Sequence, residues 1–159
     1  MGRIYDAVSS MLGLCHFNEF EGQAAMKLEF IAEDYNSEDV YEYSINLYPD
    51  EDLSSIIIDW EQMVTGILDD LRTKVPAGII SAKFHNTLVD IIVEAANLIK
   101  EKNIVLCGGC FQNKYLIESA IKRLKKEGFR PYWNTKVPTN DGGISLGQLI
   151  AASYILNKE

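Results

Sequence analysis

The sequence predicts an α/β protein in which helices flank a mixed sheet, and three observations support this class. A strand, a glycine turn, a helix and a second strand follow one another between residues 103 and 133. Apolar residues recur at helical spacing over residues 84–99, and two strand-like segments, 41–48 and 54–58, resemble a hairpin. With 159 residues, 47% of them apolar, we expect a single domain over residues 1–159.

Two short helices are predicted at the N-terminus. Apolar residues from Ile4 to Leu12 recur at helical spacing, and Gly13 stands where a helix would end. A second helix is predicted over residues 23–35, with Glu21 just before its start. A carboxylate suits that position, because the helix dipole is positive there.

The middle of the sequence predicts a hairpin followed by two helices. Residues 41–48 alternate between polar and apolar side chains, residues 54–58 are mostly β-branched, and residues 49–52 supply a turn between them. A helix over residues 60–72 is followed by a break at Pro76. The longer helix after this break carries the continuous apolar stripe that begins at Phe84.

The C-terminal third predicts a right-handed βαβ unit. A buried strand over residues 103–106 leads into the turn 107–110, a helix over residues 112–127 and a strand over residues 129–133. A last helix, 144–156, follows a second glycine-containing loop.

Charge and hydropathy narrow the classes of partner. The net charge of −8 opposes nonspecific binding to nucleic acid or to an anionic membrane. No apolar run approaches the ~20 residues that span a bilayer, so we expect a cytoplasmic protein. Residues 18–61 contain thirteen acids and only one base, Lys27. This segment is either a solvated acidic face or a docking surface for a basic partner.

The turn after the strand 103–106 is a candidate ligand site. Gly108 and Gly109 let backbone N–H groups approach a phosphate at a helix start, although paired glycines also occur in purely structural turns. The same turn has Cys107 and Cys110 at the spacing of a redox motif. A Cys-x-x-Cys redox protein is therefore an alternative, whereas a structural zinc site would need two further ligands.

Asp141 and the two histidines are the remaining candidates. Asp141 lies at a loop-to-helix junction, where it caps the last helix, binds a cation or faces bound phosphates. His16 and His85 are the only histidines, and they do not form a histidine-based metal site at helical spacing. We expect His85 to be either hydrogen-bonded or exposed.

Several spaced motifs together resemble one family. They are Gly2-Arg3-Ile4-Tyr5-Asp6-Ala7-Val8, Gly13-Leu14, Glu21-Gly22-Gln23-Ala24-Ala25-Met26, Phe84-His85-Asn86-Thr87-Leu88, Gly108-Gly109-Cys110-Phe111-Gln112-Asn113 and Asn140-Asp141-Gly142-Gly143-Ile144-Ser145-Leu146-Gly147-Gln148. In order and spacing they resemble the C-terminal part of HypF, the carbamoyltransferase of nickel-iron hydrogenase maturation. The resemblance extends from residue 2 to about residue 155.

The resemblance implies the second lobe of an actin-like, ATP-binding (ASKHA) domain. HypF-like proteins convert carbamoyl phosphate and ATP into carbamoyl-adenylate and pass the carbamoyl group to the C-terminal cysteine of the partner HypE. Such proteins also carry upstream domains, among them the first lobe of the transferase domain, that are not in this sequence. We therefore expect the chain to need those upstream lobes, and to be inactive alone.

The resemblance also implies roles for individual residues. The residues expected to contact ATP or carbamoyl-adenylate are Asp6, Glu21, Gly22, Gly108, Gly109 and Asn113. Of these, the first three resemble ribose contacts, the glycine pair resembles a phosphate turn, and Asn113 resembles a base or ribose contact. Asp141 is expected to share a divalent metal (Fe, Zn or Mg) with a histidine pair of the other lobe. Cys107 and Cys110 depart from the small or apolar residues that the family usually has in this turn.

One further alternative stays open at this point. The chain could be a stand-alone nucleotide-binding or protein-interaction module, in which the acidic segment 18–61 docks a partner and no transfer occurs.

Overall fold

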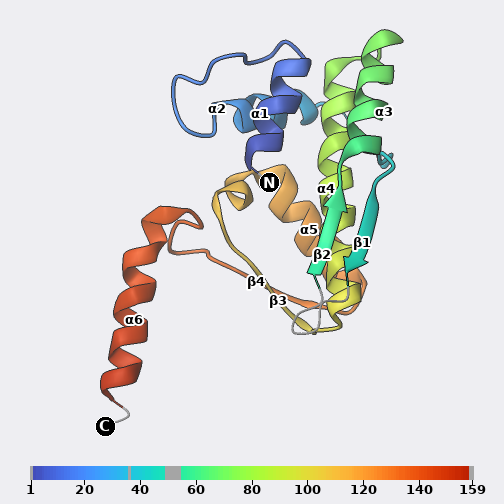
Figure 1. Ribbon diagram of the computed structural model, residues 1–159. Coiled ribbons are helices and arrows are strands. Elements are labelled where there is room, and N and C mark those ends of the chain that lie inside the picture. The colour runs from blue at the N-terminus through green and yellow to red at the C-terminus, as the bar shows by residue number, and fades with distance from the viewer. Residues whose placement is uncertain (1, 36, 49–54, 158–159) are drawn as a thin grey trace.

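The structure, a computed structural model, describes residues 2–35, 37–48 and 55–157. Helices and strands follow one another as shown in Figure 1. They are α1 (Gly2–Met11), α2 (Gln23–Ala32), β1 (Ser44–Tyr48), β2 (Ser55–Asp59), α3 (Glu61–Arg72), α4 (Ala77–Ile99), β3 (Asn103–Leu106), α5 (Lys114–Lys126), β4 (Arg130–Trp133) and α6 (Ile144–Leu156), with two short 3-10 helices, η1 (Gly109–Gln112) and η2 (Asp141–Gly143). The α/β class predicted from the sequence is confirmed.

The predicted single mixed sheet is wrong for the described strands. β1 pairs antiparallel with β2, β3 pairs parallel with β4, and the two pairs form separate sheets. The hairpin is anchored to α4, where the Tyr43 hydroxyl donates to Asp90 at 2.9 Å, whereas β4 packs on α5. Because each pair is fixed to a different helix, their edges do not meet.

Two predicted boundaries move for identifiable reasons. β1 begins at Ser44 and not at Tyr41, because the Tyr41 backbone N–H donates to Thr87 Oγ1 at 2.8 Å and not to a neighbouring strand. α5 begins after Asn113 because the turn first forms η1. The predicted hairpin turn at residues 49–52 lies outside the described residues.

α4 is the central element of the core. Twelve of its 23 residues are buried, α2, α3 and α5 pack on it, and α1 reaches it through Tyr5. The Phe84 ring meets the Tyr5 ring edge-on, with 5.1 Å between centroids. The apolar stripe predicted from periodicity is therefore the centre of the protein, as expected for a helix that is covered on several sides.

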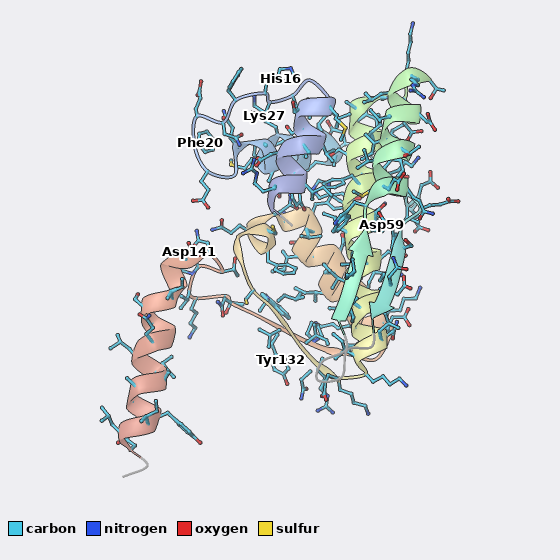
Figure 2. The ribbon with its side chains drawn as sticks, viewed as in Figure 1. His16, Phe20, Lys27, Asp59, Tyr132 and Asp141 are labelled. Atoms are coloured by element: carbon cyan, nitrogen blue, oxygen red, sulfur yellow. The ribbon has the colours of Figure 1, made fainter. Side chains whose placement is uncertain are left out.

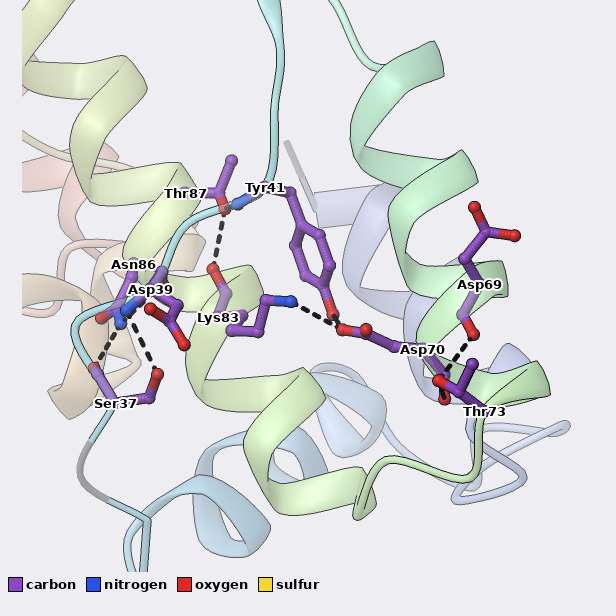
Figure 3. Close-up of polar contacts among 9 residues, drawn as sticks. All are labelled: Ser37, Asp39, Tyr41, Asp69, Asp70, Thr73, Lys83, Asn86 and Thr87. Carbon is purple, nitrogen blue, oxygen red and sulfur yellow. Dashed lines mark hydrogen bonds and ion pairs between the residues drawn. The ribbon is translucent and has the colours of Figure 1, made fainter.

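A polar network fixes the chain before β1 onto α3 and α4 (Figure 3). The Asp70 carboxylate accepts hydrogen bonds from Lys83 Nζ and from the Tyr41 hydroxyl, both at 2.7 Å. Burial alone would raise the pKa of Asp70, but these two donors outweigh it and lower the pKa. Lys83 Nζ also lies 4.3 Å from the centre of the Tyr41 ring.

α6 differs from every other α-helix of the fold. It projects away from the body of the protein (Figure 1), and none of its residues is buried. Among the residues that the structure describes, none of the helices combines the length and the hydropathy needed to cross a membrane.

Candidate functional site

The loops that follow β3 and β4 converge, as the βαβ unit predicts. The two strands are parallel, with Leu106 opposite Trp133 at their carboxyl ends. The backbone N–H of Gly108 donates to the carbonyl of Thr139 at 2.8 Å. This bond joins the Gly108–Gly109 turn to the loop that carries Asp141. Ligands of open α/β sheets bind at this edge.

The two glycines of the turn differ in what the fold requires of them. Gly108 has φ +106°, a conformation that side chains rarely adopt, so the backbone itself needs glycine there. Gly109 has no such φ, and a Cβ at this position would meet no atom within 4 Å. Nothing in the described chain explains the absence of a side chain at Gly109. Open space beside N–H groups that start a helical turn suits a close-approaching anion.

Asn113 lies in the interior. It is 5% exposed; its Oδ1 accepts the Leu116 backbone N–H at 2.8 Å, and its Nδ2 lies 3.1 Å from His85 Nε2. The side chain thus caps α5 and holds a histidine, so this placement does not support the expected base or ribose contact through its amide.

His85 is the buried partner of this asparagine. Its Nδ1 lies 2.8 Å from the Ser81 carbonyl, so Nδ1 carries the hydrogen and Nε2 accepts the hydrogen bond from Asn113. Burial lowers the pKa of His85 to about 4, and the bond to Ser81 opposes this shift without cancelling it. Of the two expectations for this residue, the hydrogen-bonded one is confirmed and the exposed one is wrong.

The expected ribose contacts lie on α1 and on the loop before α2. Asp6 is partly exposed and accepts a hydrogen bond at 3.0 Å from Asn18 Nδ2, which ties this loop to α1. Glu21 and Gly22 are exposed, and Gly22 has φ +81° where α2 begins. A further bond, from the Lys114 backbone N–H to Glu29 Oε1 at 2.9 Å, ties α2 to the start of α5. The structure thus places these residues on elements next to the glycine turn.

Asp141 is exposed at the start of η2, at the base of α6 (Figure 2). No side chain caps α6, whose N-cap is Gly143, and the short helix η2 is capped by Asn140, whose Oδ1 accepts the Gly142 backbone N–H at 3.1 Å. The capping interpretation of Asp141 is therefore wrong, and its carboxylate is left on the surface. In the described ranges no three His, Cys, Asp or Glu side chains gather to hold a metal ion. Asp141 fits the role of a single ligand, with the others supplied from outside these residues.

One cysteine of the pair, Cys110, lacks the property of a reactive redox thiol. Cys107 is exposed, Cys110 is partly buried, and both are free thiols. Burial raises the pKa of the Cys110 thiol, whereas a reactive cysteine needs a lowered pKa. This observation counts against the redox alternative.

Two open grooves, which sequence reasoning missed, lie away from these residues. One, of about 670 Å³, lies between α5 and β4 and includes Trp133 and Lys125. The other, of about 600 Å³, lies beside α3 and is lined by Glu42, Asp59 and Asp69 among others. The acid-rich segment 18–61 was the sequence signal for the second groove, and docking of a basic partner there stays a prediction. Neither groove contains a predicted site residue.

Comparisons with known proteins agree with the resemblance. The family model described as "Carbamoyltransferase, Kae1-like Domain, second subdomain" matches residues 1–148. Carbamoyltransferase HypF of Synechocystis sp. is 38% identical over 151 residues, which are 95% of this chain and 19% of the relative. A crystal structure of full-length HypF in the phosphate- and nucleotide-bound form is 44% identical, with a TM-score of 0.88 over 98% of this chain and 20% of that one. HypF of T. kodakarensis has a TM-score of 0.77 at 25% identity. The chain spans about a fifth of the length of these proteins.

Proposed function

The chain belongs to the family of HypF carbamoyltransferases, as the second subdomain of their Kae1-like domain, and we propose that it is the nucleotide-binding half of that domain. On this proposal its fold is the second lobe of an actin-like ATPase domain. The nucleotide lies in a cleft between this chain and a first lobe supplied by the rest of the protein.

The complete protein, on this proposal, uses ATP and carbamoyl phosphate to form carbamoyl-adenylate. It then transfers the carbamoyl group to the C-terminal cysteine of a HypE-like acceptor during hydrogenase maturation. This chain supplies binding and orientation rather than a nucleophile. Electrostatic stabilisation by backbone donors and a bound cation suits acyl transfer of this kind.

The residues of the candidate site have separate roles in this proposal. The N–H groups at Gly108 and Gly109 bind phosphate oxygens, which approach through the open space beside Gly109. Asp6 and Glu21, with Gly22, bind the ribose hydroxyls, because a carboxylate accepts two hydrogen bonds from neighbouring hydroxyls. Asn113 and His85 act as positioning residues that hold η1 against α4.

Asp141 supplies one ligand to a divalent cation. When bound, the cation neutralises phosphate charge and polarises the oxygens of the reacting group. The exposed carboxylate, which is not used for capping, fits this role.

The convergence of the two loops is the observation that carries the proposal. The 2.8 Å bond between Gly108 N and Thr139 O puts the glycine turn beside the Asp141 loop, at the carboxyl edge of a parallel pair. A full-length HypF of the same fold is described in a phosphate- and nucleotide-bound form, which supports nucleotide binding by the complete protein.

A chimera tests the role of Asp141. In it, this chain replaces the matching fifth of Synechocystis HypF, and carbamoyl transfer to the acceptor protein is measured. Asp141→Asn removes the charge that holds the cation, so we expect folding to be kept and transfer to fall at least about 100-fold. Glu101→Gln, at an exposed carboxylate before β3, is the matched control and should leave transfer unchanged. Near-normal transfer by Asp141→Asn would rule out the cation role.

A further inference from the structure

The groove between α5 and β4 combines a partly open aromatic ring with aliphatic and basic side chains. It has a volume of about 670 Å³, and Ile117 and Ile121, both partly buried, line it from α5. Trp133, at the end of β4, lines its other side and is 37% exposed. Lys125 Nζ lies 5.5 Å from the centre of the Trp133 ring. A tryptophan ring beside aliphatic side chains is the kind of surface that binds an apolar anchor of a partner protein.

The groove lies in the basic part of an acidic chain. Residues 114–136 contain seven Lys or Arg and two Asp or Glu residues, although the whole chain has 15 of the former and 23 of the latter. Lys122 and Lys125 line the groove together with a single acid, Glu118. None of the ion pairs among the residues that the structure describes includes either lysine. Both charges are therefore free to attract a negatively charged partner.

The lining of the groove favours an acidic protein segment over a nucleic acid. An apolar side chain of such a segment fits against Trp133 and the two isoleucines, and carboxylates beside it reach Lys122 and Lys125. A nucleic-acid strand carries a negative charge at every nucleotide, so it would also meet the acidic remainder of a chain with a net charge of −8.

Short pieces of chain join the groove to the candidate site. Thr135, at the end of its lining, comes six positions before Asp141, and Ile117 comes four positions after Asn113. A protein bound in the groove is thus held on the two elements that lead into the candidate site. The proposed function requires one protein to come to that place, namely the acceptor of the carbamoyl group.

We propose that the groove between α5 and β4 is a docking site for an acidic segment of the acceptor protein, with an apolar anchor residue against Trp133. This inference rests on the proposed function for the identity of the partner, whereas the charge and shape of the groove are properties of this chain. Docking raises the local concentration of the acceptor beside the candidate site and takes no part in the chemical step.

Calorimetry of the isolated chain with purified HypE of Synechocystis tests the proposal, because every residue of the groove belongs to this chain. We expect a dissociation constant of about 100 µM or tighter. Lys122→Glu combined with Lys125→Glu should weaken binding at least about tenfold, since both positions then repel the acidic segment. Lys102→Glu, at an exposed lysine before β3, is the matched control and should leave binding within about twofold of the wild type.

Transfer kinetics of the chimera with Synechocystis HypF give a second readout. The double variant should raise KM for the acceptor at least about tenfold and leave kcat and KM for ATP unchanged, because docking precedes the chemical step. Lys122→Arg combined with Lys125→Arg keeps both charges and should keep KM for the acceptor near the wild-type value. If the glutamate variant does not fold, Lys122→Gln combined with Lys125→Gln replaces it, with an expected increase of about threefold or more.

Several outcomes would overturn the proposal. They are no acceptor binding by the isolated chain, equal binding by the wild type and the double variant, and an equal loss with Lys102→Glu. Three further results would assign the groove to another occupant. Binding of unfractionated tRNA that needs the same two lysines would indicate a nucleic acid, and self-association that the double variant loses would indicate a second copy. Acceptor binding by the isolated chain but not by the chimera would indicate another part of the complete protein.

Calorimetry with ATP on the same proteins separates this proposal from its premise. Acceptor binding by the isolated chain, without ATP binding by the chimera, would leave docking intact and refute the nucleotide role. Carbamoyl transfer by the chimera with an unchanged KM for the acceptor in the double variant would refute docking alone.

Discussion

Helices α4 and α6 are both predominantly apolar, and they end in opposite environments. Twelve of the 23 residues of α4 are buried, whereas none of the 13 residues of α6 is. α4 is surrounded by helices of this chain, and α6 leads away from them (Figure 1). Composition therefore tells how much burial a helix needs, but not which part of a protein provides it. At the β3–β4 sheet, Leu106 packs in the core of this chain, whereas Val105 on the other face is exposed.

Removing a buried side chain from α4 should lower the free energy of unfolding far more than removing an exposed one from α6. Phe84→Ala should lower the free energy of unfolding by about 3–5 kcal/mol, because Phe84 is fully buried against Tyr5. Leu149→Ala on α6 should change it by less than about 0.5 kcal/mol in the isolated chain. Urea unfolding of both variants measures the difference. Equal losses would contradict the claim that α6 buries no residue in this chain.

The pH dependence of stability tests the buried polar centre of α4. The folded pKa of His85, about 4, lies below the unfolded value of 6.5, so between these values the unfolded chain binds the proton more readily. Stability is complete above pH 6.5 and falls as the pH is lowered towards 4, by about 3 kcal/mol from this group.

Unfolding curves at several pH values, compared with those of His85→Gln, isolate this contribution. The stability of His85→Gln should no longer fall by the His85 contribution between pH 6.5 and 4. His16→Gln, at an exposed histidine, should keep this fall in stability. A wild-type protein with the same pH profile as His85→Gln would show that His85 is not buried in its neutral form.

Alanine substitutions at Gly143 and Gly109, both near the loop junction, should have different effects on stability. A Cβ at Gly143 would lie 2.7 Å from the Pro138 carbonyl oxygen, so Gly143→Ala should cost about 1–3 kcal/mol of stability. Gly109→Ala meets no atom of the chain and should leave stability almost unchanged, yet weaken ATP binding by the chimera. Thermal unfolding and calorimetry measure the two quantities. Unchanged ATP binding by Gly109→Ala would remove this glycine from the phosphate site.

Local sequence signals predicted most of the elements and the convergence of the two loops. The periodicity of α4 and the order of strand, glycine turn, helix and strand were enough, because both are patterns within short segments. The mixed sheet was wrong because strand pairing depends on which helix each pair packs against. The contact of Asn113 with His85, 28 positions earlier in the chain, could not be predicted, because it joins two segments that only the fold brings together. Asn140 and Asp141 are adjacent and cap helices equally well, so only the structure distinguishes them.

ATP binding by the isolated chain and by the chimera with Synechocystis HypF tests the central claim most directly, namely that this chain is one half of a nucleotide site. Calorimetry should give a dissociation constant no better than about high micromolar for the isolated chain, because half of the cleft is supplied by the other subdomain. The chimera should bind at least about tenfold more tightly, and its binding should weaken when Gly109 is replaced by alanine. Nanomolar binding by the isolated chain, or equal binding by both proteins, would contradict the claim.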